Sequence, residues 1–158
     1  MKSLLMLISI LSCTALIAQN DVTWIGGTPG KQADWNEARN WSNQRVPDEY
    51  SNVIIKWANS GHHAQPVITG EANVLSIEIH GGATLSLEEN AHLSIDGGHA
   101  YTLGIQLYGG RLVNDGQIDL HNIDHLSAEV VRQQCEGKGV VYVDDLMSRE
   151  RQVAETSY

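Results

Sequence analysis

The chain has 158 residues and a formal net charge of −9, with 19 Asp and Glu against 10 Lys and Arg. Its length fits one domain, and its acidic balance without a cluster of Lys or Arg argues against a nucleic-acid partner, because phosphate binding depends on clustered cations. Phe is absent, Gly numbers 15, and short runs of Val, Ile and Leu recur between turn residues. This composition is typical of all-β proteins.

Residues 1–18 have the pattern of a secretory signal peptide. Lys2 is followed by an apolar run over 4–18 and then by polar residues. The run has about fifteen residues, fewer than the roughly 20 that a spanning helix needs. We therefore expect no transmembrane segment, cleavage near Ala18, and a secreted or cell-surface protein. The alternative is lipidation at Cys13, which would tether the domain to a membrane.

Cleavage near Ala18 would leave Cys135 as the only cysteine of the mature chain, so no intramolecular disulfide could form. An exported domain without a disulfide has to rely on its core for stability. We expect Cys135 to be buried in that core rather than reactive.

Residues 19–51 hold Trp24, Trp35 and Trp41, three of the four tryptophans, in a stretch without regular periodicity. Gly and Pro residues, Pro47 among them, turn the chain here. If the strands that follow form stacked coils, the first coil exposes unpaired backbone groups and apolar side chains. We therefore predict that 19–51 is an N-terminal cap that covers this coil with large aromatic side chains.

Residues 52–145 contain an internal repeat. The segment VLSIEIHGG (74–82) aligns with TLGIQLYGG (102–110), and HLSID (92–96) aligns with QIDLH (117–121) after a three-residue deletion. A third copy, displaced by 23 residues, aligns the following pairs: Ile105 with Ala128, Leu107 with Val130, Gly116 with Gly139, Ile118 with Val141, and Leu120 with Val143. A constant displacement over two segments and a glycine predicts a repeat architecture.

Apolar and polar residues alternate within each copy, which predicts strands with one buried face. Copies of this length cannot bury that face alone, and stacking gives each copy a neighbour. We predict a short single-stranded parallel β-helix, or β-solenoid, of about four coils over 52–145. A β-sandwich is the structural alternative, because it also has short strands separated by turns.

The alignment also predicts which outward side chains form columns on the first strand of each coil. Glu78, Gln106 and Glu129 form one column, in which neutral Gln106 separates two carboxylates. Beside it His80 lies over Tyr108, and such an aromatic pair could support a sugar ring. We name Glu78, His80, Gln106 and Tyr108 as candidate ligand-binding residues; the plainer interpretation is an ordinary cross-strand pair.

Outward side chains of the other strand fall into two further columns: Asp96, His121 and Asp144, and beside them Ser94, Asp119 and Tyr142. Two carboxylates around an imidazole could ligate a divalent cation or hold a histidine for proton transfer. Coils spaced about 4.8 Å apart make such ligands converge poorly, so solvated surface groups are the alternative. His62 and His63 precede a proline and are interpreted as loop residues.

Residues 146–158 follow Asp144 and Asp145, either of which suits a helix N-cap. The segment is predicted to be a short helix that closes the last coil or a frayed tail, and both alternatives stay open.

The start of the domain has five short motifs in order: WIG (24–26), DW (34–35), NWS (40–42), VP (46–47) and VII (53–55). This pattern resembles the opening of secreted bacterial surface proteins built on a parallel β-helix. It is also similar to the eight-glycine extracellular domain. The resemblance implies surface adhesion, matrix contact or carbohydrate binding, and it supplies no catalytic motif for this sequence.

These patterns favour a non-catalytic extracellular or cell-surface module whose partner is a surface glycan or a matrix component. The alternative is a polysaccharide lyase or hydrolase with Asp96, Asp119, His121 and Asp144 as its catalytic residues, by analogy with other β-helices. Motifs for nucleotide binding, structural zinc or a nucleophile elbow do not occur in the sequence. We expect no cofactor, apart from a divalent cation if Asp96, His121 and Asp144 form a metal site.

Overall fold

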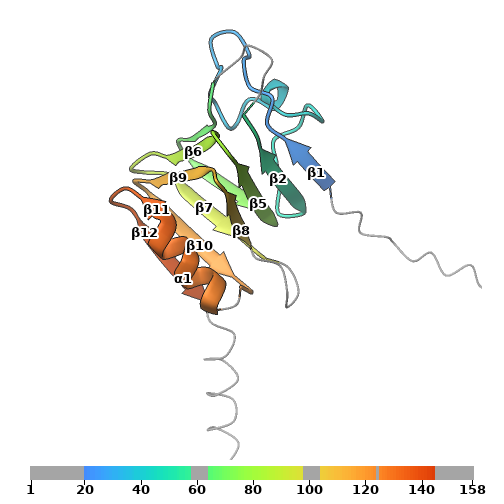
Figure 1. Cartoon of the computed structure of the whole chain (residues 1–158). Helices are drawn as coiled ribbons and strands as arrows, with labels where there is room; N and C mark the ends of the chain where they lie inside the picture. The colour runs from blue at the N-terminus through green and yellow to red at the C-terminus, as the bar shows by residue number, and fades with distance from the viewer. Residues whose placement is uncertain (1–19, 58–63, 98–103, 124, 145–158) are drawn as a thin grey trace, which may run out of the picture.

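The computed structural model describes residues 20–57, 64–97, 104–123 and 125–144, which wind as a β-solenoid with three parallel sheets (Figure 1). The first sheet contains β1 (Asn20–Thr23), β2 (Ser51–Ile55), β5 (Ser76–His80) and β8 (Ile105–Tyr108). The second contains β3 (Val67–Ile68), β6 (Thr84–Leu87), β9 (Arg111–Asn114) and β11 (Cys135–Glu136). The third contains β4 (Glu71–Val74), β7 (His92–Ile95), β10 (Gln117–His121) and β12 (Val140–Asp144). Neighbouring strands within each sheet are parallel, which confirms the predicted fold class.

One turn of the solenoid passes through the first, second and third sheets in that order. Within the described residues β2–β3–β4, β5–β6–β7 and β8–β9–β10 make three complete turns. A fourth turn follows, in which the helix α1 (His125–Gln134) precedes β11 and β12. The four predicted coils are therefore three turns of strands and a fourth that starts with a helix.

The strand register agrees with the sequence alignment of the first two copies. Ile77 pairs with Ile105 between β5 and β8, and Leu93 pairs with Ile118 between β7 and β10. The third copy is correctly aligned in the third sheet, where Ile118 pairs with Val141. The repeat therefore identified equivalent positions in consecutive coils.

The prediction of a strand around Ala128 in the third copy is wrong, because this segment lies in α1. Ala128 and Val131 are buried and Val130 is half exposed, a spacing that follows the helical period rather than strict alternation. Glu129 therefore does not continue the column of Glu78 and Gln106. Its carboxylate instead lies 3.8 Å from the Arg132 guanidinium and accepts a hydrogen bond from Gln133 on the same helix.

The second sheet was not predicted as a separate sheet, and it accounts for the three-residue deletion between copies. The loop from β5 to β6 is one residue longer than that from β8 to β9, and the loop from β6 to β7 is two residues longer than that from β9 to β10. The length difference therefore falls at two corners of the coil, where turns absorb it without moving the paired strands.

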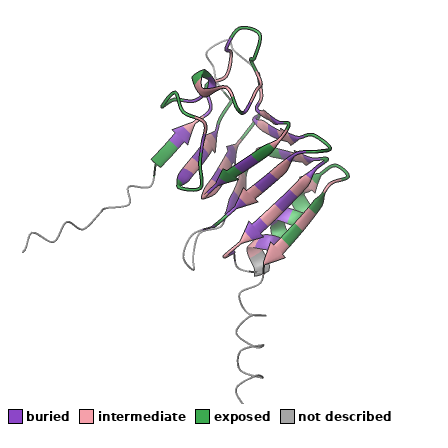
Figure 2. Cartoon of the chain, turned by 180° about the vertical axis from the view of Figure 1, so that it is seen from behind, coloured by how far each residue is buried: buried purple, intermediate pink, exposed green. Residues whose placement is uncertain are grey.

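The core lies inside the coils, where alternate residues of the strands meet (Figure 2). The pattern is regular: β2, β5, β7 and β10 each alternate buried with partly exposed residues. Ile77, Ile79 and Leu93 of one coil and Leu120 of the next are fully buried. Burying each such side chain contributes about 1.5–3 kcal/mol, so stacking gives the coils their main source of stability.

The predicted Trp-rich N-terminal cap is confirmed. Trp24, Trp35 and Trp41 are all buried, with ring centroids 4.8 Å apart for the Trp24–Trp41 pair and 4.7 Å apart for the Trp35–Trp41 pair, in edge-to-face packing. The cap also pairs with the first strands of two sheets. β1 pairs with β2, and the backbone N–H of Trp35 donates a hydrogen bond to the backbone carbonyl of Val67 in β3. Pro47, also predicted in the cap, is buried.

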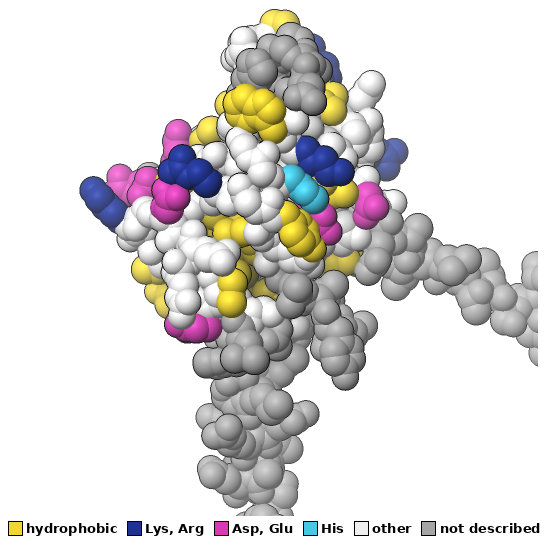
Figure 3. Space-filling model, in the orientation of Figure 1, with side chains coloured by type: hydrophobic (Ala, Val, Ile, Leu, Met, Phe, Trp, Pro, Cys, Tyr) yellow, Lys and Arg dark blue, Asp and Glu magenta, His cyan; other side chains and the backbone are white. Residues whose placement is uncertain are grey.

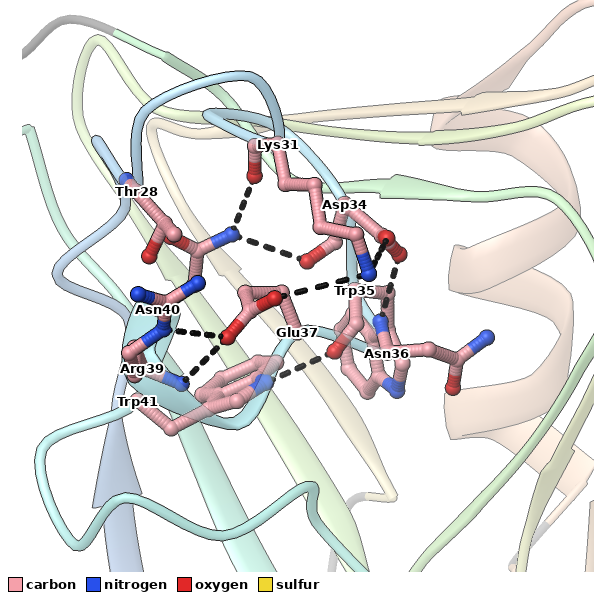
Figure 4. A network of polar contacts seen from close by, with 9 residues as sticks. All are labelled: Thr28, Lys31, Asp34, Trp35, Asn36, Glu37, Arg39, Asn40 and Trp41. Carbon is pink, nitrogen blue, oxygen red and sulfur yellow. Dashed lines mark hydrogen bonds and ion pairs between the residues drawn. The ribbon is translucent and has the colours of Figure 1, made fainter.

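A buried polar network holds the irregular cap together (Figure 4). The side-chain carbonyl of Asn40 accepts from the Thr28 N–H, and its amide group donates to the carbonyls of Lys31 and Asp34. Asn40 ends the short 3-10 helix η1 (Ala38–Asn40). Next to it, the side-chain hydrogen bond from Arg39 lowers the pKa of the Glu37 carboxyl to about 2. In the cap, hydrogen bonds from side chains satisfy backbone groups that regular secondary structure would otherwise pair.

Three groups of predictions concern residues outside the described ranges. They are the signal peptide over 1–18 with the lipidation alternative at Cys13, the loop residues His62 and His63, and the C-terminal segment 146–158. These stay predictions. Across the described residues, no helix has the length and apolar character needed to cross a membrane.

Candidate functional site

The outward face of the first sheet brings together all four candidate ligand-binding residues. Pairing of β5 with β8 puts Glu78 beside Gln106 and His80 beside Tyr108, as the repeat predicted. The His80 and Tyr108 rings have centroids 5.1 Å apart and planes tilted by 34°. Tyr108 is 54% exposed, so the outer surface of this pair is accessible to a ligand.

Hydrogen bonds along each strand hold these side chains in place. The Glu78 carboxylate lies 3.1 Å from Nε2 of His80, and the Tyr108 hydroxyl donates to the side-chain carbonyl of Gln106. Each bond joins residues two apart on one strand, which project from the same side. The rings are therefore fixed both by their neighbours on the strand and by each other.

This arrangement combines two aromatic rings with hydrogen-bonding groups on the outward face of one sheet. A pyranose ring presents C–H groups on its faces, which pack on an aromatic ring, and hydroxyls at its edge, which need polar partners. Glu78 accepts hydrogen bonds, and Gln106 both accepts and donates them. The chemistry of the face therefore suits a carbohydrate.

One exposed aromatic residue near these strands, next to the turn that follows β5, was not predicted from the sequence. Trp57 follows β2 by two residues and is 44% exposed. A Cβ atom added at Gly82, in the turn after β5, would meet Trp57 side-chain atoms at 3.5–3.7 Å. Figure 3 shows hydrophobic side chains gathered beside a histidine, with charged side chains next to them, on the face turned to the viewer.

The outward face of the third sheet brings together most of the second set of candidates. Asp119 pairs with Ser94 on one side and with Tyr142 on the other, and His121 pairs with Asp144. Nδ1 of His121 lies 3.7 Å from Oδ2 of Asp144. Asp96 follows the end of β7, and its carboxylate accepts a hydrogen bond from the side chain of Asn122. The column of Ser94, Asp119 and Tyr142 is thus present. In the other column His121 and Asp144 are paired, and Asp96 is held by a residue of the adjoining turn.

Two adjoining hollows lie over this sheet and share His121 and Asp144. One has a volume of about 540 Å³, and Asp96 is part of its lining. The other has a volume of about 460 Å³, and Asp119 and Tyr142 line it. Of the four residues in the enzyme alternative, Asp96 and Asp119 therefore line different hollows, while His121 and Asp144 line both.

Asp119 also has partners that the sequence analysis missed. Its carboxylate lies 2.8 Å from Nε2 of His92 and accepts from the Gln117 amide at 2.9 Å. His92 is paired with Gln117 across the strands, so its contact with Asp119 runs diagonally. The sequence alignment compared residues directly opposite each other and could not show a diagonal pair.

The metal hypothesis at Asp96, His121 and Asp144 gains no support from the geometry. Among the described residues, no group of three or more His, Cys, Asp or Glu side chains is arranged so that it could hold a metal ion. The Asp96 carboxylate accepts a hydrogen bond from Asn122, whereas His121 and Asp144 lie 3.7 Å from each other.

Cys135 lies in β11 and is partly rather than fully buried, packed against the edge of the core. Burial raises the pKa of its thiol, which disfavours the reactive thiolate. Cys135 was predicted to be buried, and it is only partly so. The reason is that its strand, β11, belongs to the last described coil and is paired on one side, with β9.

Comparisons with models of protein families, with curated proteins and with solved structures find no match to this chain. The geometry of its own two faces is therefore the basis for a functional proposal.

Proposed function

We propose that the protein is a non-catalytic, extracellular or cell-surface β-solenoid that binds glycans through the outward face of its first sheet. The observation that carries the proposal is the His80–Tyr108 ring pair, in which Tyr108 is exposed and His80 is partly exposed, flanked by Glu78 and Gln106 and fixed by strand pairing. A matrix component that presents sugars at its surface is a ligand of the same chemistry.

The rigidity of the face supports this proposal. Ile77, Ile79 and Ile105 point from the same strands into the core and are at most 5% exposed, so β5 and β8 are anchored beneath the ring pair. A preorganised surface loses little conformational entropy when a ligand binds. Weak contacts to single sugars can then give useful affinity, especially on a surface that displays many copies.

A glycan array tests the proposal with a matched pair of variants. Tyr108 and Tyr142 are 54% and 56% exposed and project from strands of different sheets. We expect the wild-type protein to bind a set of saccharides, Tyr108→Ala to lose that binding, and Tyr142→Ala to retain it. Binding by no saccharide, or equal binding by both variants, contradicts the proposal.

Export is the second part of the proposal, and it rests on the apolar N-terminal pattern and Ala18. Export is tested by producing the protein in bacterial cells and sequencing the N-terminus of the protein found outside their cytoplasm. A mature chain that begins near Gln19 supports signal-peptide cleavage, and one that begins with a modified Cys13 supports the lipidated alternative. An intact Met1 on protein that stays in the cytoplasm contradicts export.

A second candidate function is polysaccharide cleavage on the third sheet, favoured by the two hollows that share His121 and Asp144. In this alternative Asp119, held by His92, acts as a base or acid together with a neighbouring carboxylate. An assay for new reducing ends or unsaturated sugars separates the candidates. Cleavage that disappears in folded Asp119→Asn favours the enzyme, whereas saccharide binding without cleavage favours the binding module.

A further inference from the structure

Lys56 directly follows β2 on the outward face of the first sheet. Ile55, the last residue of β2, is buried and pairs with Ile79, whereas Lys56 is exposed. Continuing this register by one residue places Lys56 beside His80, which in turn pairs with Tyr108. Lys56 therefore lies in the column of the ring pair, one coil before His80 and two coils before Tyr108.

Packing just beyond Lys56 supports this register. A Cβ atom added at Gly82, two residues after His80, would lie 3.5 Å from the Cβ atom of Trp57. The chain over 55–57 therefore stays against the neighbouring coil instead of turning away from it. Figure 3 shows a Lys or Arg side chain directly beside a histidine, next to hydrophobic side chains, on the face turned to the viewer.

Lys56 has no carboxylate partner of its own among the described residues. Four other cations of the described chain form ion pairs: Lys31, Arg39, Arg111 and Arg132. No ion pair of the described ranges includes Lys56. Its ammonium group has three N–H donors and no acceptor, so a negatively charged group on a ligand would be a suitable partner.

The first sheet is also less acidic than the third. The outward face of β2, β5 and β8, together with the residue after β2, carries one lysine and one carboxylate, Lys56 and Glu78. The outward face of the described third-sheet strands carries Glu71, Asp119 and Asp144 and no Lys or Arg. Because the whole chain has a formal net charge of −9, an anionic ligand is repelled by much of the surface but meets balanced charges on the first sheet.

We propose that this face selects sugars that carry a negative charge, a carboxylate or a sulfate group, on the pyranose ring. The sugar ring packs on Tyr108 and His80, and the Lys56 ammonium pairs with the anionic group. The four-carbon stem of lysine is flexible and neighbouring coils lie about 4.8 Å apart, so the ammonium group can reach a substituent of a sugar bound on the next coils. This inference rests on the proposed glycan binding and adds the ligand class and a residue that determines specificity.

Matched saccharides test the effect of charge while the rest of the ligand stays the same. Trisaccharides of gluco and galacto configuration are each used in three forms: neutral, oxidised at C6 to the uronate, and sulfated at O6. Chemical-shift titrations give the dissociation constants at about 0.15 M salt, where a Debye length of about 8 Å screens distant carboxylates. We expect a charged form to bind about three- to fivefold more tightly than its neutral form, the effect of one exposed charge pair. The form that binds more tightly identifies the anion as carboxylate or sulfate.

Variants show whether Lys56 causes the preference. Lys56→Gln removes the charge and is expected to bind charged and neutral forms equally, whereas Lys56→Arg should keep the preference. Lys138→Gln is the matched control, because it changes the net charge by the same amount at an exposed position between β11 and β12. This control should bind like wild type. Thermal melts establish that each variant is folded.

The outcomes distinguish this inference from the proposed function. Equal binding of charged and neutral forms by the wild-type protein overturns the inference, and so does a preference that persists in Lys56→Gln or is lost equally in Lys138→Gln. If neutral saccharides bind in that case and Tyr108→Ala abolishes their binding, glycan binding by the first sheet stands without charge selection. If no form binds and the array is also negative, both proposals fail.

Discussion

At the scale of single residues, Asn40 is the clearest example of a side chain that replaces secondary structure. It is fully buried, and its amide satisfies one backbone N–H and two backbone carbonyls of the cap. Figure 4 shows these bonds converging on its side chain, with Asn36 at the edge of the same network. Such a residue determines the path of the chain more strongly than any local propensity.

We predict that Asn40→Ala lowers the free energy of unfolding by about 1–3 kcal/mol, because it leaves buried backbone groups without partners. Urea unfolding followed by tryptophan fluorescence measures the change. Asn36→Ala, at an exposed position of the same cap, is the control and should stay within about 0.5 kcal/mol of wild type. Equal stability of the two variants would show that the polar network does not hold the cap.

The residues of the candidate site differ in how far the sequence could predict them. His80 and Tyr108 were predicted together because their pairing follows directly from the repeat. Trp57 was missed because its position depends on the route of a turn, and the His92–Asp119 contact was missed because it is diagonal. A repeat in the sequence predicts which residues lie opposite each other on neighbouring strands. Contacts made in turns, or between diagonal positions on two strands, can be found only from the three-dimensional structure.

At the scale of elements, glycines let the coils stack closely at their corners. A Cβ atom at Gly116 would lie 2.3 Å from the carbonyl oxygen of Ala91 in the coil before, and one at Gly139 would lie 2.4 Å from the carbonyl oxygen of Gly116. The repeat had aligned these two glycines, and the structure shows the reason: each lies against the backbone of the preceding coil.

Gly116→Ala is predicted to destabilise the protein by about 1–3 kcal/mol, the usual cost of overpacking, because the clash is with backbone rather than with a flexible side chain. Gly70→Ala is the matched control, since a Cβ atom there meets nothing within 4 Å. Thermal unfolding of the two variants makes the comparison. A melting temperature of Gly116→Ala equal to that of Gly70→Ala would contradict close stacking at this corner.

Elements with several alternating residues were predictable, and short or ambiguous ones were not. β5, β7 and β10 have four or five residues with strict alternation, whereas β3 and β11 have two residues each. The segment around Ala128 fits both an alternating and a helical pattern over a few residues. The burial of Val131 follows the helical pattern, so packing over the whole of α1 decided between them.

At the scale of the whole molecule, the solenoid presents two chemically different faces on one rigid core. The first sheet shows aromatic rings with amide and carboxylate neighbours, and the third sheet shows Asp119, His121 and Asp144 over two hollows. In Figure 2 buried residues alternate with partly exposed ones along the strands of these sheets, so both faces lie over the same core. Binding at one face need not disturb the other.

Chemical-shift mapping tests the central claim most directly. Isotope-labelled protein is titrated with the saccharide that gives the strongest array signal, and backbone amide shifts are followed. We predict that the changes concentrate in 76–80 and 105–108, the strands that carry the ring pair on the first sheet. Changes confined to 92–95, 117–121 and 140–144 on the third sheet would contradict the account.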